Sequence, residues 1–184
     1  MARWTVRAIV RDMLPVLVVL TLVELGSGLV LDTLQDTLLR YPSLLVLVPV
    51  TIGMGGNLGS ILAARLSTSF HLGTLSFDPT DEHLAGNALA TLALAISIFP
   101  IVGIGAWGLT AVFGGVRLGP GTVVAVALSS GVALAVLAVA VTLSVTYVAY
   151  RFSLDPDDVV IPVVTNTCDV LGVVVLFATV QVLL

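Results

Sequence analysis

The chain has 184 residues, of which 58% are hydrophobic and only 10% are charged, with a mean hydropathy of +1.17. A water-soluble domain of this size does not need so much apolar surface, so the composition excludes that class and indicates an integral membrane protein. The net charge of −4 and the absence of a run of basic residues argue against nucleic acid as a partner and leave the lipid bilayer as the expected one.

Five apolar segments follow one another, and each is long enough for a helix that crosses the membrane, which takes about 20 residues. The first contains the single charge Glu24 and the last the single charge Asp169. We therefore expect an all-α integral membrane protein with five transmembrane helices per protomer. Residues 1–12 are expected to form a short cytosolic N-terminus, and residues 13–184 one membrane domain. The segments are Met13–Leu31, Leu44–Ala64, Leu84–Val116, Leu118–Tyr150 and Val159–Leu184.

The arginines predict how these segments are oriented. If the N-terminus is cytoplasmic, the inner side holds five arginines and the outer side only Arg40 and Arg117. This distribution favours a cytoplasmic N-terminus, and five crossings then place the C-terminus outside the cell membrane. An odd number of crossings excludes an inverted duplication within the chain. A five-helix unit is also small for a pore, so association of two copies about a two-fold axis is the simplest symmetric conduit.

Two connections carry the acidic residues outside the segments. The loop at about 67–83 contains two histidines and three acids, and an ordinary exposed loop explains them better than a metal site does. Before the last segment, Asp155 suits a helix N-cap and Pro156 the first helical position, with Asp157 and Asp158 in the first turn. Helix initiation is enough to explain these aspartates, and acids at a pore entrance would also concentrate cations.

The last segment contains a polar cluster around Asp169. Thr165 and Asn166 lie three and four residues after Pro162, Asp169 lies four and three residues after them, and Gly172 lies three residues after Asp169, which places all five on one face of a helix. A carboxylate at membrane depth costs about 2.5–3.5 kcal/mol on insertion scales, so it is kept where it faces protein, water or an ion. Two interpretations stand: a cation site, or a carboxylate hydrogen-bonded to a neighbouring helix.

The second segment is rich in glycine and contains one amide. Gly55, Gly59 and Ala63 form a ladder of small residues that is typical of close helix packing in membranes. Asn57 is different, because an amide at this depth needs polar partners, and Ser60 lies one turn away. The second and last segments each combine a proline with a polar face. We predict that they pack together and line the path of an ion.

These two segments resemble the MgtE-type magnesium channels and their eukaryotic solute-carrier relatives. The resemblance is carried by Val48-Pro49, by Gly-Gly-Asn-Leu-Gly at 55–59 and by Ala-Arg-Leu-Ser-Thr at 64–68. It continues with Leu154-Asp155-Pro156 and with Asp169-Val170-Leu171-Gly172 in the last segment. It covers nearly the whole chain.

The resemblance implies a homodimer with a pore on the two-fold axis and Mg²⁺ as the transported ion, with Mn²⁺ or other divalent cations as further candidates. It implies that Asp169 from both chains holds hydrated Mg²⁺ and that Thr165, one turn earlier, offers its backbone carbonyl. The residue types themselves add Asn166 as a further acceptor one turn away. Residues expected to line the pore are Gly56, Asn57, Ser60, Pro162 and Asp155.

The chain also departs from the family pattern. Ile161 replaces an asparagine before the proline of the last segment, and Ile61 replaces a glutamine after the second-segment motif. About a dozen residues precede the first segment, so we expect this chain to lack the cytosolic sensor domain of the bacterial channels.

The residue types suit magnesium, which prefers oxygen ligands and releases its water reluctantly. Cys168 is the single cysteine and is expected to be a small buried residue. Glu24 is either a second ion contact or a structural hydrogen-bonding group, and the structural interpretation is slightly favoured. Three alternatives to a channel are a Na⁺- or H⁺-coupled exchanger, a non-transporting membrane subunit and an intramembrane enzyme. The enzyme would use Ser129 or Ser130, but the segments supply no histidine, so we expect no enzyme.

Overall fold

The computed structural model describes residues 5–74, 77, 81–152, 154 and 156–184. These residues form six α-helices, and five of the helices are long and apolar enough to cross a membrane. The all-α class and the five expected spans are therefore confirmed. The helices are α1 (Val6–Thr33), α2 (Gln35–Arg40), α3 (Pro42–His71), α4 (Glu82–Val112), α5 (Pro120–Phe152) and α6 (Pro156–Leu183).

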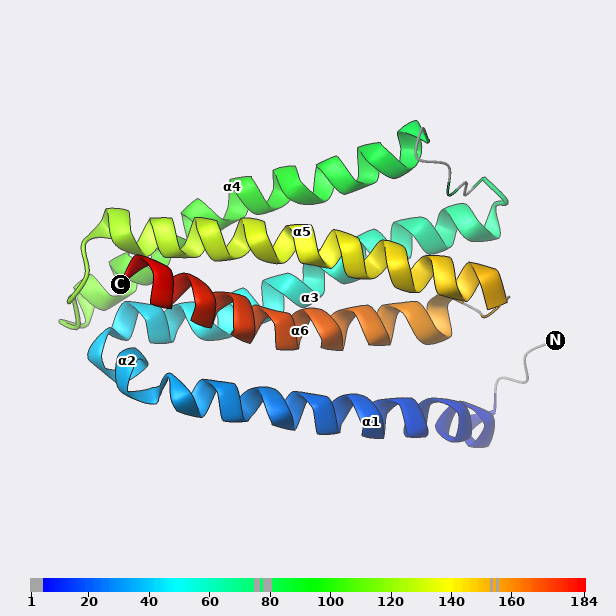
Figure 1. The fold of residues 1–184 in the computed structure, drawn as a ribbon, viewed down its shortest axis with the longest axis horizontal. Coiled ribbons are helices and arrows are strands. Elements are labelled where there is room, and N and C mark those ends of the chain that lie inside the picture. The colour runs from blue at the N-terminus through cyan, green and yellow to red at the C-terminus, as the bar shows by residue number, and fades with distance from the viewer. Residues whose placement is uncertain (1–4, 75–76, 78–80, 153, 155) are drawn as a thin grey trace.

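The five long helices run up and down beside one another in an elongated bundle (Figure 1). Helix α2, the connection from α4 to α5 and the C-terminus lie at one end, which we call the α2 end. The start of α1 and the start of α6 lie at the opposite end. The two ends of the chain thus lie at opposite ends of the bundle, as an odd number of crossings requires.

The helix boundaries follow from local chemistry. The Asp81 carboxylate caps α4 by accepting hydrogen bonds from the backbone N–H groups of His83 and Leu84, at 2.8 and 3.3 Å. Helix α3 begins with Pro42, whose missing N–H costs nothing at the first helical position. Gly73 and Gly114 follow the ends of α3 and α4 with φ of +67° and +78°, a left-handed conformation that glycine adopts without strain.

Some boundaries differ from the predicted ones. Helix α3 continues to His71, so the connection to α4 is shorter than the predicted loop of residues 67–83. Helix α4 ends at Val112 rather than Val116, because Gly114 and a second glycine follow. Helix α1 begins at Val6, inside the predicted N-terminal segment 1–12.

Helix α2 is an element that the apolar pattern did not predict. It is short and mostly polar, and it is held to the bundle by Leu34 and Leu38, which are buried in the core at the α2 end. Asp36 in its first turn and Arg40 in its last turn suit the helix dipole. The apolar pattern of the sequence did not predict α2 because the helix is mostly polar. Two buried leucines nevertheless hold it against the bundle.

Helices α4 and α5 approach closely at a glycine. A Cβ atom added to Gly131 of α5 would fall onto the ring of Phe99 of α4, which is completely buried. The ring cannot move toward lipid, so this contact fixes the spacing of the two helices.

We expect Gly131→Ala to destabilise the protein by about 1–3 kcal/mol, the usual cost of overpacking a well-filled core. The measurement is the thermal unfolding midpoint of the purified protein in detergent. Gly105→Ala in α4 is the matched control, because its added methyl group would meet no atom within 4 Å. An unchanged midpoint for Gly131→Ala would contradict this packing.

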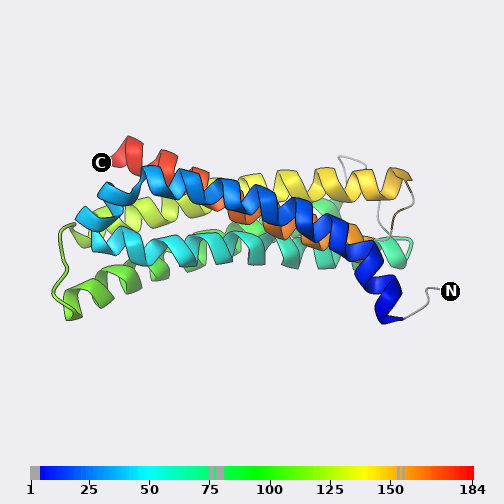
Figure 2. The same ribbon diagram turned by 90° about the horizontal axis from the view of Figure 1, so that it is seen from below.

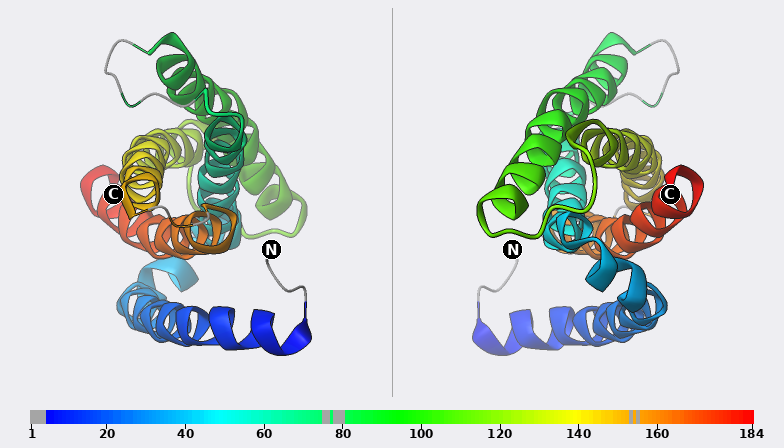
Figure 3. Two further views of the ribbon diagram at one scale, coloured as in Figure 1. Left: turned by 90° about the vertical axis from the view of Figure 1, so that its right-hand side faces the viewer. Right: turned by 90° about the vertical axis from the view of Figure 1, so that its left-hand side faces the viewer.

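Helix α1 lies beside the bundle rather than within it (Figures 2 and 3). Its main packing partner in the described chain is α6, with a small contact to α2. None of the residues in its most apolar stretch is buried. In a membrane, most of its surface is therefore free to face lipid or another chain.

Candidate functional site

The second and last spans, α3 and α6, form the most extensive helix contact in the described chain. The prediction that these two helices pack together is confirmed. A Cβ atom at Gly59 would lie 2.6 Å from Val164 Cγ1 and 3.0 Å from Cys168 Sγ, and one at Gly172 would lie 3.1 Å from Ile52 Cα. Glycines on both helices thus let the two backbones approach closely.

Gly55 extends the same packing face to a third helix. A Cβ atom there would lie 2.6 Å from Leu134 Cδ2 of α5 and 3.2 Å from the backbone oxygen of Cys168. Cys168 is free and buried, as predicted. Gly55 and Gly59 are also buried, so the ladder predicted from the sequence is a packing face.

The Asp169 carboxylate lies against Gly56 at the centre of this contact. A Cβ atom at Gly56 would lie 2.6 Å from Asp169 Oδ1 and 3.1 Å from Thr165 Cγ2. Asp169 as a whole is partly exposed, but its Oδ1 is buried and has no hydrogen-bond partner among the described residues. Gly56 therefore makes room for a carboxyl oxygen that forms no hydrogen bond of normal geometry within this part of the chain.

The polar residues one turn before Asp169 are partly exposed. The Asn166 side-chain amide donates a hydrogen bond of 2.9 Å to the backbone oxygen of Pro162, which lies inside α6. This bond fixes the side chain, and within the described ranges its Oδ1 accepts no hydrogen bond. Thr165 points its methyl group toward Gly56. Asn166 therefore keeps an acceptor free on the face of α6 that carries Asp169.

On α3, Asn57 is exposed and lies next to Gly56. The Ser60 hydroxyl donates to the backbone oxygen of Asn57 at 3.1 Å, so Ser60 satisfies its own donor within the helix. No side-chain hydrogen bond of Asn57 is formed with the described chain. Asn57 thus offers both its amide donor and its acceptor at the surface, one residue from the glycine that Asp169 contacts.

Glu24 of α1 is the second acid near this face. It belongs to the helix that packs on α6, and its backbone oxygen accepts a 2.7 Å hydrogen bond from the Ser27 hydroxyl. The hydrogen bond from a serine or threonine of another span that the structural interpretation called for is not formed with any described residue. The structure therefore places Glu24 on the helix that packs against the one carrying Asp169, an arrangement that the spacing of the sequence could not predict.

Two further residues singled out in the sequence, Asp155 and Ser130, add little to the description of the site. Asp155 lies outside the described residues, although α6 begins at Pro156 as predicted. Ser130, one of the two serines considered for an enzyme, is buried and donates to the backbone oxygens of Val126 and Ala127 at 2.7 and 3.1 Å. Its hydroxyl proton is thus committed to its own helix.

A dedicated metal cage is not formed by the single chain as described, because no three Cys, His, Asp or Glu residues cluster there. The arrangement offers one carboxylate with an unpartnered oxygen, a second acid nearby and uncharged acceptors. These side chains can attract a cation and hold it through the cation's water shell, but they are too few to enclose it in direct bonds.

Five long apolar helices, with a carboxyl group at the contact of two of them, indicate a multi-pass membrane protein with a polar site inside its membrane domain. The family model MgtE, described as a divalent cation transporter, matches residues 48–179. The chain therefore belongs to the MgtE family of divalent cation transporters, which confirms the resemblance seen in the sequence and is consistent with a protein that is not an enzyme. No curated protein and no solved structure was found to match the chain.

Proposed function

We propose that this protein carries Mg²⁺ across the cell membrane through a pore on the two-fold axis of a homodimer, and that the Asp169 residues of both chains hold the hydrated ion. The observation that carries the proposal is the buried Asp169 Oδ1, which forms no hydrogen bond of normal geometry with the described residues. At membrane depth an uncompensated carboxylate costs about 2.5–3.5 kcal/mol or more. A cation and its water shell remove this cost.

The ligands around Asp169 favour magnesium with its water retained. Mg²⁺ requires near-octahedral oxygen geometry and loses water reluctantly, so it is usually bound through few direct protein bonds. The free oxygens of Asn166 and Asn57 can accept hydrogen bonds from the water shell. Weak binding through water also lets the ion leave, which conduction requires.

The exposed residues beside Asp169 support a dimer. In the single chain, Asn57 and Gly53 of α3 are exposed and Thr165 of α6 is partly exposed, although they lie next to a closely packed contact. A second copy facing them across a two-fold axis would supply a second Asp169 and enclose the path. The unburied α1 offers further surface for this association.

The distribution of arginine supports a cytoplasmic N-terminus. Arg65 near the end of α3 and Arg151 near the end of α5 lie at the same end of the bundle as Arg7 and Arg11 of α1. Only Arg40 and Arg117 belong to the α2 end. The end richer in arginine faces the cytoplasm in most multi-pass proteins, so the α2 end and the C-terminus face outward.

A coupled exchanger is the second candidate, and the observation that favours it is the packing of α1, which carries the intramembrane acid Glu24, against α6, which carries Asp169. Two acids in one site could bind a proton or Na⁺ in alternation with Mg²⁺. In that case flux would depend on the gradient of the counter-ion and would saturate.

The test is Mg²⁺ uptake by liposomes that contain the purified protein, measured at a set membrane voltage with and without Na⁺ and H⁺ gradients. We expect uptake that follows the voltage and is unaffected by either gradient. Empty liposomes are the control. Uptake driven only by a counter-ion gradient would favour the exchanger, and uptake no faster than in empty liposomes would contradict transport.

A further inference from the structure

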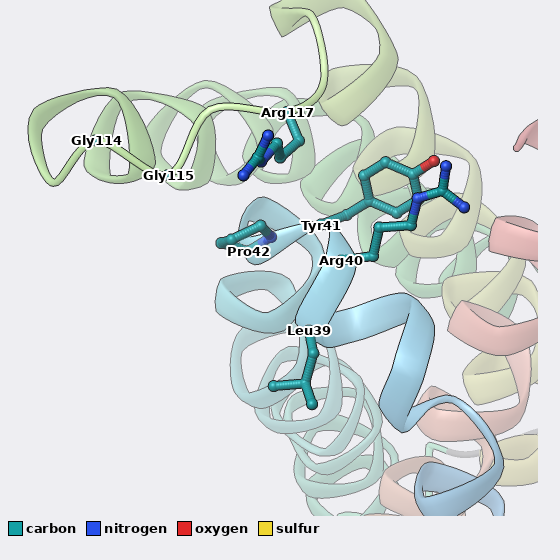
Figure 4. A pocket seen from close by; sticks show the side chains of 7 residues that line it. All are labelled: Leu39, Arg40, Tyr41, Pro42, Gly114, Gly115 and Arg117. Atoms are coloured by element: carbon teal, nitrogen blue, oxygen red, sulfur yellow. The ribbon is translucent and has the colours of Figure 1, made fainter.

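A pocket of about 540 Å³ lies at the α2 end of the bundle (Figure 4). It is formed where two separate parts of the chain meet, the junction of α2 with α3 and the connection from α4 to α5. A Cβ atom at Gly115 of this connection would lie 3.4 Å from the Pro42 ring, so the two parts are in contact. The residues that line the pocket are Leu39, Arg40, Tyr41, Pro42, Gly114, Gly115 and Arg117.

The pocket carries two positive charges and no acid. Neither Arg40 nor Arg117 forms an ion pair or a side-chain hydrogen bond with a described residue, including Asp36, which lies one helical turn before Arg40. The Arg40 guanidinium lies 5.5 Å from the centre of the Tyr41 ring, a cation–π contact that orients it. The positive end of helix α3 and the negative ends of α2 and α4 all lie at the pocket and oppose one another, so the net positive charge comes from the two guanidinium groups. The pocket therefore attracts an anion.

The surroundings of the pocket place this anion at the membrane surface. At about 1.5 Å per residue, the 30 residues of α3 span about 45 Å, close to the thickness of a bilayer with its headgroups. Pro42 at the first position of α3 therefore lies at headgroup level. Next to the pocket, Leu39, Val112 and Phe113 are 63%, 80% and 84% exposed, so the same surface offers contacts for acyl chains.

We propose that the pocket between Arg40 and Arg117 binds the phosphate group of an anionic phospholipid. Guanidinium groups bind phosphate oxygens through charge-assisted, often bidentate, hydrogen bonds. The lipid chains lie along the exposed apolar residues of α2 and α4. Two positive charges without an acid select an anionic headgroup over a zwitterionic one, and the site anchors the α2–α3 junction and the α4–α5 connection to the bilayer.

Native mass spectrometry of the detergent-purified protein, titrated with phosphatidylglycerol, tests this proposal. We expect the Arg40→Gln, Arg117→Gln double variant to bind the lipid about tenfold more weakly or worse, because two charge-assisted contacts are lost. Arg151→Gln, an exposed arginine at the opposite end of the bundle, is the matched control and should bind as the wild type does. The Arg40→Lys, Arg117→Lys variant keeps the charge and should retain most of the affinity.

Three outcomes would overturn the proposal. The first is equal phosphatidylglycerol affinity in the wild type and in the double glutamine variant. The second is equal affinity of the wild type for phosphatidylcholine and phosphatidylglycerol. The third is displacement of the lipid by millimolar inorganic phosphate, which would assign the pocket to a free anion. Unchanged helical circular dichroism in each variant shows that a loss of binding is not a loss of folding.

Discussion

Asp169→Asn is expected to lower Mg²⁺ uptake into liposomes by roughly a hundredfold. The substitution keeps the size of the side chain and removes the charge from both copies in a dimer. Each charged hydrogen-bonding group contributes about 1.5–3 kcal/mol, so two groups correspond to at least two orders of magnitude in ion binding. The measurement is the initial rate of uptake per folded protein, at Mg²⁺ concentrations below saturation.

The matched control for this substitution is Asp36→Asn in α2. Asp36 is exposed and lies in the first turn of a short helix, so its change removes the same charge far from the α3–α6 contact. We expect this variant to transport Mg²⁺ at the wild-type rate. Uptake by Asp169→Asn that matches uptake by Asp36→Asn would show that the Asp169 charge has no part in transport.

Gly56→Ala is expected to lower uptake about tenfold in protein that still folds. The new methyl group would lie 2.6 Å from Asp169 Oδ1, which is too short for a carbon–oxygen contact, so either the carboxylate rotates or α3 and α6 move apart. Both changes displace the charge from the position that the proposed ion path requires. The same liposome assay measures the loss, and the thermal midpoint in detergent measures stability.

Two other glycine-to-alanine variants distinguish an effect on the Asp169 carboxylate from an effect on helix packing. Gly59→Ala would press on Val164 and Cys168 instead, so we expect lower stability and near-normal uptake per folded protein. Gly105→Ala in α4, far along the sequence from both helices of the site, would meet no atom within 4 Å and should change neither quantity. If Gly56→Ala and Gly59→Ala lower uptake equally, the close approach of Gly56 to Asp169 has no special role.

The fold was largely predictable because each span is a long apolar run that ends at charges, glycines or prolines. The pairing of α3 with α6 was also predictable, since a helix with Gly55 and Gly59 needs a close neighbour and the polar face of α6 needs shelter from lipid. Helix α2 was not, because its burial depends on Leu34 and Leu38 meeting a core built from distant segments. The hydropathy of the sequence does not predict such contacts between distant segments.

Within the candidate site, the residue types were predictable and their contacts were not. An acid, an amide and several glycines are unfavourable inside apolar membrane segments, so their presence there indicates a polar site. Which glycine faces Asp169 depends on the rotation of α3 against α6, and the approach of Glu24 depends on where α1 lies beside the bundle. The pocket between Arg40 and Arg117 likewise joins two connections that are far apart in sequence.

The central claim is that a hydrated Mg²⁺ ion lies on a two-fold axis between the Asp169 carboxylates of two chains. Electron cryomicroscopy of the protein in lipid nanodiscs, with Mg²⁺ and again with a chelator, tests it most directly. The expected map in Mg²⁺ shows a dimer with density for one ion and its water between the two carboxylates, and this density disappears with the chelator. Asp169 facing lipid, or enclosed within its own chain away from any symmetry axis, would contradict the account.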